Sequence, residues 1–183
     1  MADPKEFTLF SGGAAGAEAC FGELAAQYGL AEVNFTFDGH QLARAHGARM
    51  LTPEELARKD VSLAYVSKLL NRRFTNAPLM RKVLQTIMHM VESGHEIFVV
   101  GTIQEDNTVK GGTGWGAEFA KICNKPLYVY GQGRDCWFKW DGDGWQEVQA
   151  PVITAQHFCG TGTRFLEEQG RKAIEDLFIR SFT

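Results

Sequence analysis

The feature that most constrains this chain is a glycine-rich turn between two apolar segments. Residues 97–100 form an apolar run, residues 111–114 read Gly-Gly-Thr-Gly, and residues 118–123 have a helix-like pattern. Glycine lets backbone N–H groups turn toward a ligand that a Cβ would block. When such a turn opens a helix, its free N–H groups and the positive end of the helix dipole suit a phosphate or another anion. The sequence therefore predicts a strand, an anion-binding turn and a helix in this order.

A stretch near the start of the chain has the same design. A short apolar strand pattern leads into residues 11–16, Ser-Gly-Gly-Ala-Ala-Gly, and an apolar stripe at helical spacing follows as far as Gly29. The spacing Gly-Gly-x-x-Gly differs from the GxGxxG fingerprint, which disfavours a Rossmann dehydrogenase. We name residues 11–16 the first glycine turn and residues 111–114 the second. Each is followed by a glutamate, Glu18 and Glu118 respectively.

Strand-like and helix-like segments alternate along most of the chain. Residues 78–93 form a long amphipathic helix pattern, residues 126–130 form a further apolar strand, and residues 61–70 fit either a strand or a helix. This alternation predicts an α/β fold with a Rossmann-like, doubly wound, mainly parallel sheet flanked by helices. At this length, we expect residues 1–183 to form one domain.

The pattern changes in the C-terminal part. The aromatic residues and glycines around Asp141 predict a β-hairpin at about residues 134–150, before the last helix. The hairpin could be a lid that stacks on a base, an edge cover or a dimer contact. Residues 160–164, Gly-Thr-Gly-Thr-Arg, are interpreted as the loop that precedes the last helix and as a third anion contact.

Composition and charge exclude several classes of function. The net charge of −3 gives no electrostatic reason to expect nucleic-acid binding, and residues 71–73, the one compact basic cluster, are interpreted as a charged loop. No apolar run approaches the length of a membrane span and no signal peptide opens the chain, so we expect a cytoplasmic protein without a membrane partner. The four cysteines form no CxxC pair, so we expect no metal, and we expect no cofactor.

The second glycine turn together with Glu118 resembles a known motif, Pro-Gly-Gly-x-Gly-Thr-x-x-Glu. It is typical of the lonely-guy phosphoribohydrolases, the lysine decarboxylase-like proteins. In this chain Lys110 replaces the motif proline and Trp115 replaces its threonine. The family belongs to a Rossmann-like superfamily that includes DNA-processing protein A and molybdenum-cofactor carrier-like proteins, and the first glycine turn is similar to the other glycine turn of that superfamily. The resemblance covers roughly residues 7–130 and implies a nucleotide-binding fold.

The resemblance also implies which residues would act. Glu118 matches the glutamate that works at the ribose carbon, and Arg81 is the positional candidate for an assisting arginine. We expect the chain to bind a nucleotide or a ligand related to NAD or ADP-ribose, with the phosphate held by the two turns. The residues expected to hold it are Ser11, Gly12, Gly13, Gly16, Gly111, Gly112, Thr113 and Gly114.

Three hypotheses of function follow from these expectations. In the first, the protein hydrolyses an N-glycosidic bond: Glu118 stabilises an oxocarbenium-like transition state or positions water, and Arg81 neutralises charge on the leaving side. In the second, it is a non-catalytic nucleotide sensor or a molybdenum-cofactor carrier-like protein. In the third, the glycines serve only tight packing and Glu118 only complements the helix dipole. By analogy with the family we expect a homodimer.

Overall fold

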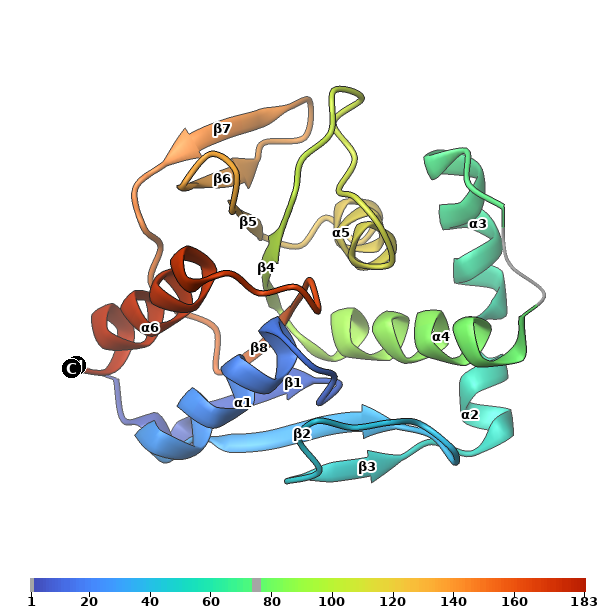
Figure 1. Ribbon diagram of the computed structural model, residues 1–183, viewed down its shortest axis with the longest axis horizontal. Coiled ribbons are helices and arrows are strands. Elements are labelled where there is room, and N and C mark those ends of the chain that lie inside the picture. Colours follow the sequence, from blue (N-terminus) through green and yellow to red (C-terminus); the bar gives the residue numbers. More distant parts are fainter. Residues whose placement is uncertain (1, 74–76) are drawn as a thin grey trace.

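One mixed sheet dominates the fold. The computed structural model describes residues 2–73 and 77–183, and within them eight strands form a sheet in the order β3-β2-β1-β8-β4-β5-β6-β7 (Figure 1). The strands from β3 to β5 in this order are parallel, and β6 and β7 are antiparallel to their neighbours. Their bounds are β1 Thr8–Ser11, β2 Ala31–Thr36, β3 Ala48–Met50, β4 Glu96–Gly101, β5 Leu127–Gly131, β6 Cys136–Trp140, β7 Trp145–Val148 and β8 His157–Gly162.

Helices cover both faces of the sheet. Helices α1 and α6 pack together on one face, and α4 packs with α2, α3 and α5 on the other (Figure 1). The helices span α1 Ala17–Tyr28, α2 Pro53–Ala57, α3 Asp60–Leu70, α4 Pro78–Ser93, α5 Thr113–Ile122 and α6 Glu168–Phe182, with a 3-10 turn at Pro4–Glu6. The ambiguous residues 61–70 are therefore helical.

The central strands are buried on both faces. In β4, Ile97 and Val99 belong to the core under α4 and α5, whereas Phe98 and Val100 belong to the core under α1 and α6. Successive side chains of a strand point to opposite faces, so a strand covered on both sides is apolar throughout. This explains why residues 97–100 form an uninterrupted apolar run.

Strand β8 was not predicted from the sequence. The prediction of a loop was wrong for residues 160–162, which lie in the middle of the sheet between β1 and β4. A Cβ on Gly160 would lie 2.5 Å from the Phe21 ring, and a Cβ on Gly162 would lie 2.4 Å from the carbonyl oxygen of Val100. These glycines therefore permit close packing around a strand, which is a known use of glycine inside a sheet.

The coarse prediction of fold class agrees with the structure. The molecule is a mixed α/β protein with a mostly parallel sheet flanked by helices, which is consistent with a Rossmann-like fold. Strands β6 and β7 extend the sheet at one edge, and β8 separates them from α6 in the sequence.

Candidate functional site

Both glycine turns lie at the carboxyl edge of the parallel strands. The first follows β1, and the second follows β4 after a loop at residues 102–110. Only β8 separates β1 from β4 in the sheet. Ligands of open α/β sheets usually bind at this edge, at the point where the strand order reverses. The fold therefore places both turns where a ligand would be expected.

The first glycine turn is covered by other parts of the chain. The carbonyl oxygen of Gly13 accepts hydrogen bonds from the backbone amides of Ala43 and Arg44, each at 3.0 Å. Gly16 has a φ of +93°, and a Cβ there would lie 2.4 Å from the carbonyl oxygen of Thr163. Residues 43–44 and 163–164 thus contact the turn directly, and Ser11, Gly12 and Gly13 are buried.

A buried carboxyl group lies against this turn. Glu18 Oε1 accepts a hydrogen bond from the Ala14 amide at 3.2 Å, and Oε2 accepts one from Thr161 Oγ1 at 2.7 Å. Glu18 is buried, and burial raises the pKa of its carboxyl group above the ordinary value, although the two hydrogen bonds oppose this shift. Nearby, Ser11 Oγ donates to the carbonyl oxygen of Gly160 at 2.6 Å. The Ser11 hydroxyl, the Glu18 carboxyl group and the Ala14 amide therefore have partners within the chain.

The second glycine turn is open. Gly111 and Gly112 are exposed, and a Cβ on either would meet open space. Within residues 2–73 and 77–183, the amides of Gly111, Gly112 and Thr113 have no hydrogen-bond acceptor. They lie at the start of α5, where free amides and the helix dipole both favour an anion. Gly114 differs from its neighbours, because a Cβ there would lie 1.8 Å from the carbonyl oxygen of Val109.

A cavity of about 370 Å³ adjoins the open turn. Its lining combines backbone of the turn, two arginines and apolar side chains: Arg72, Arg73, Met80, Leu84, Gln104, Gly111, Gly112 and Trp115. Arg73 is exposed and makes no ion pair with any described residue. The cavity therefore combines positively charged arginine side chains with an apolar wall.

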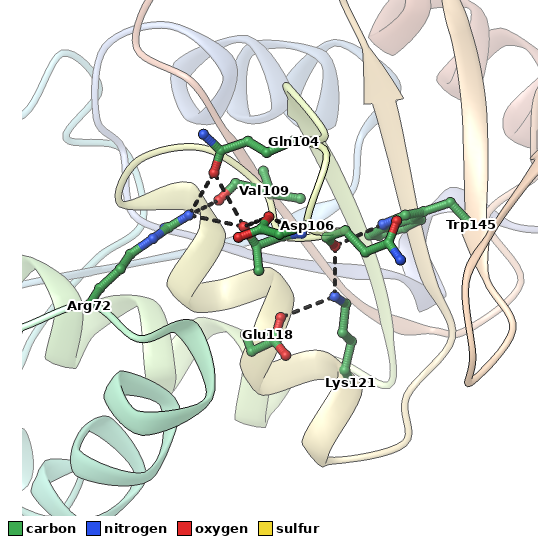
Figure 2. Close-up of polar contacts among 9 residues, drawn as sticks. Arg72, Gln104, Asp106, Val109, Glu118, Lys121 and Trp145 are labelled. Atoms are coloured by element: carbon green, nitrogen blue, oxygen red, sulfur yellow. Dashed lines mark hydrogen bonds and ion pairs between the residues drawn. The ribbon is translucent and has the colours of Figure 1, made fainter.

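Arg72 fixes the loop that leads into the second turn. Its guanidinium donates to the carbonyl oxygen of Val109 at 2.9 Å and to the side chains of Gln104 and Thr108 at 2.9 and 3.2 Å (Figure 2). It also donates to the carbonyl oxygen of Gly111 at 2.9 Å. Because one planar guanidinium holds four acceptors, the loop is held in a defined conformation beside α3. The amides of the turn are therefore positioned before any ligand arrives.

Glu118 points toward Lys121, three residues further along α5 (Figure 2). Its Oε2 lies 3.0 Å from Lys121 Nζ and accepts no hydrogen bond from the part of the chain that the structure describes. Lys121 Nζ also donates to the carbonyl oxygen of Asn107 at 3.0 Å and lies 3.9 Å from the centre of the Trp140 ring. Trp145 Nε1 donates to the same carbonyl oxygen at 2.9 Å. Trp140 of β6 and Trp145 of β7 thus contact Lys121 and Asn107, and they hold the loop at residues 102–110 from the side of the hairpin.

Arg81 pairs with an acidic residue of α3. Its guanidinium lies 3.0 Å from the Asp60 carboxylate, which also accepts a hydrogen bond from Gln85 at 2.8 Å. Arg81 and Glu118 thus have different partners. The Arg81 ion pair joins α4 to α3, and the Glu118 ion pair lies within α5. The catalytic roles expected for both residues remain predictions, as do the ligand contacts expected from the two turns.

Sequence reasoning missed the residues that shape the open turn. Arg72 and Arg73 belong to the cluster that the sequence suggests is a charged loop, and Lys121 lies inside an ordinary helix pattern. The signal available was the position of two adjacent arginines just after the apolar segment at residues 61–70. Their contact with a turn nearly forty residues away depends on how α3 packs beside α5.

Comparison with known proteins gives no family for this chain. No protein-family model, no curated protein and no solved structure matches it. Two further observations concern residues 2–73 and 77–183 only. No group of three or more His, Cys, Asp or Glu side chains there is arranged to hold a metal ion, and none of their helices has the length and apolar character needed to cross a membrane.

Proposed function

We propose that this protein binds a small phosphate-bearing ligand, a nucleotide or a nucleotide derivative, at the second glycine turn. The observation that carries the proposal is the set of three consecutive amides without acceptors at Gly111, Gly112 and Thr113. These amides begin a ten-residue helix and adjoin a cavity that Arg72 and Arg73 also line. Free amides, a helix dipole and a cation at one place favour a phosphate group.

The remaining walls of the cavity favour an organic ligand over free phosphate. Met80, Leu84 and Trp115 line it beside the basic end. Apolar and aromatic surface of this kind suits the flat face of a base or a ring, while a few polar groups fix the orientation. A nucleotide combines both chemistries in one molecule.

Binding without hydrolysis agrees best with the surroundings of Glu118. A carboxylate that acts at a sugar carbon must reach the bound ligand, whereas Glu118 is paired with Lys121 beneath the hairpin. We therefore favour a nucleotide sensor or a carrier of an anionic cofactor over an N-glycosidase. Hydrolysis is a defined alternative outcome of the experiment below.

The experiment is a thermal-shift and calorimetric screen of the purified protein against AMP, other nucleoside monophosphates, ADP-ribose, NAD and molybdate. A ligand at a hundred times its Kd should stabilise the fold by about 2.7 kcal/mol. We expect a nucleotide to bind, and we expect Arg73→Gln to weaken it about tenfold, because one charge-assisted contact is lost. Arg58→Gln is the matched control, since Arg58 is an exposed arginine on the other side of α3 in the sequence.

Each outcome has a defined meaning. Equal binding by wild type and Arg73→Gln would contradict the proposed site. Release of free base by the wild type but not by Glu118→Ala would replace the sensor or carrier with a hydrolase. No shift with any of these anions would leave the third hypothesis, in which the glycines serve packing alone.

A further inference from the structure

The first glycine turn encloses the carboxyl group of Glu18. Oε1 lies within hydrogen-bonding distance of the Ala14 amide, and a Cβ on Gly12 would lie only 2.5 Å from the same oxygen. The other oxygen accepts the hydroxyl of Thr161 from β8. The side chain is buried, so no solvent competes for these contacts.

The turn has the elements that usually bind an external anion. It follows a parallel strand, contains three glycines and begins the twelve-residue helix α1. The second turn presents the same elements to solvent. In the first turn the oxygen that accepts from the Ala14 amide comes from the chain itself, because Glu18 lies in the first turn of α1 and its side chain reaches back.

We propose that the Glu18 carboxyl group occupies the anion-binding position of the first glycine turn, so that the protein has one open phosphate-binding turn. Glu18 is in this sense a specificity-determining residue. It fills with a carboxyl group the position that a second phosphate would need.

This occupancy has a consequence for the ligand, and that consequence rests on the proposed function. A ligand held by one turn is recognised through a single phosphate position. A pyrophosphate that spans both turns has no second position to use, so ADP-ribose and NAD should gain no affinity over AMP from their second phosphate. The occupancy itself is independent of any ligand at the second turn.

The test is chemical rescue of Glu18→Ala by acetate, which supplies the atoms that the substitution removes. Loss of the carboxyl leaves the Ala14 amide and the Thr161 hydroxyl buried without partners, so we expect the variant to melt roughly 5–10 °C lower. Apolar and polar cavities left by truncation can admit small molecules. We expect sodium acetate, at ionic strength held constant with sodium chloride, to recover half or more of the loss.

The control is Glu18→Gln, which keeps the size of the side chain and an oxygen for the Ala14 amide. Neither Glu18→Gln nor the wild type should gain stability from acetate over chloride. If Glu18→Ala folds, as shown by circular dichroism, and acetate stabilises it no more than the wild type, the proposal is overturned. Because no nucleotide is present, this result does not depend on whether the second turn binds a phosphate.

A second pair of variants decides the matter if Glu18→Ala yields no folded protein. Gly12→Ala places a Cβ 2.5 Å from Glu18 Oε1, whereas Gly112→Ala places one in open space at a helical φ of −60°. We expect Gly12→Ala to lower the melting temperature by several degrees and Gly112→Ala to leave it unchanged. Equal melting temperatures for the two variants would show that no carboxyl group fills the first turn.

Discussion

The two glycine turns of this protein are similar in sequence and opposite in environment. Both follow a parallel strand, both begin a helix, and both precede a glutamate. In the first, Gly13 and Gly16 contact distant backbone and Glu18 is enclosed. In the second, a Cβ on Gly111 or Gly112 would meet open space, and the amides of Gly111, Gly112 and Thr113 have no acceptor among the described residues. A glycine turn therefore predicts a backbone geometry, and the neighbours that fold against it decide whether a ligand can enter.

The two arginines beside the turns differ in the same way. Arg44 donates through its backbone to Gly13 and through its side chain to the buried Glu32 carboxylate at 2.6 and 2.8 Å. Arg72 donates to Gly111 and holds the loop, and it also lines the cavity. The backbone of Arg44 contacts the first turn, and its side chain makes an ion pair with a buried carboxylate. Arg72 fixes the shape of a turn that stays accessible.

The largest effect should separate a closed glycine from an open one. Gly16→Ala combines a φ of +93° with a Cβ 2.4 Å from the carbonyl oxygen of Thr163, whereas a Cβ on Gly112 meets nothing within 4 Å. We expect Gly16→Ala to cost about 3–5 kcal/mol of unfolding free energy, and Gly112→Ala to cost nothing or to stabilise slightly. Urea denaturation measures both. A cost below about 1 kcal/mol for Gly16→Ala would show that the two turns are equally open.

The next largest effect should separate the two arginines. Arg44→Met removes the guanidinium from the Glu32 carboxylate, which is 1% exposed and then keeps only Asn34 Nδ2 at 2.7 Å and His46 Nε2 at 4.0 Å. We expect a loss of about 3 kcal/mol in unfolding free energy with unchanged AMP affinity, because breaking a buried pair leaves an uncompensated charge. For Arg72→Met we expect a loss of about 1–2 kcal/mol and a clear fall in AMP affinity. Urea unfolding and calorimetric titration with AMP distinguish the two, and the comparison fails if Arg44→Met weakens AMP as much as Arg72→Met does.

A smaller effect should appear in the pH dependence of stability. The folded-state pKa of Glu18 is raised by burial, so the folded protein binds a proton more tightly than the unfolded chain. The stabilising contribution of the protonated form is complete below the ordinary pKa of 4.5 and is lost as pH rises through the folded pKa. Glu18→Gln lacks this titration, and the other buried ionisable group beside it, the Cys159 thiol, has a raised pKa of its own.

We therefore expect the wild type to lose stability relative to Glu18→Gln as pH rises from below 4.5 toward neutral. Urea unfolding of both proteins across this pH range measures the difference. Parallel pH profiles for the two proteins would indicate that the Glu18 carboxyl group has the same pKa folded and unfolded. Such a result would contradict the rise in the Glu18 pKa expected from burial, and it would not bear on the hydrogen bonds of the first turn.

The smallest effect should be the response to salt. Arg73 is exposed, so its attraction for a phosphate is screened by ions, while the Glu18 contacts are buried. We expect AMP affinity to fall a few-fold when ionic strength rises from about 0.01 to 0.15 M, and to fall less in Arg73→Gln. Melting of the ligand-free wild type should hardly change over the same range. An equal salt response of AMP binding in both proteins would argue against a contact between Arg73 and the phosphate.

Much of the fold could be predicted because its signals are local. The apolar run at residues 97–100 indicated a buried strand, and the periodic pattern at residues 78–93 indicated the helix α4. Strand β8 escaped prediction, because Gly160 and Gly162 look like a loop in sequence and only their contacts with Phe21 and Val100 explain them. Local patterns indicate the secondary structure that a segment prefers. A glycine inside a strand instead depends on the groups that pack closely against it, and these are not visible in the local sequence.

The sequence by itself determined the alternation of strands and helices, the two glycine turns and the glutamate after each. Only the tertiary structure decided that the first turn is closed and the second is open. Glu18 finds Thr161 from a strand 143 residues away, and Gly13 meets Arg44 across a loop. Arg72 reaches Gly111 from 39 residues away, and Trp145 reaches Asn107 from 38 residues away. Such contacts join residues that no periodicity or spacing connects, because they arise only when the sheet brings distant segments to the same edge.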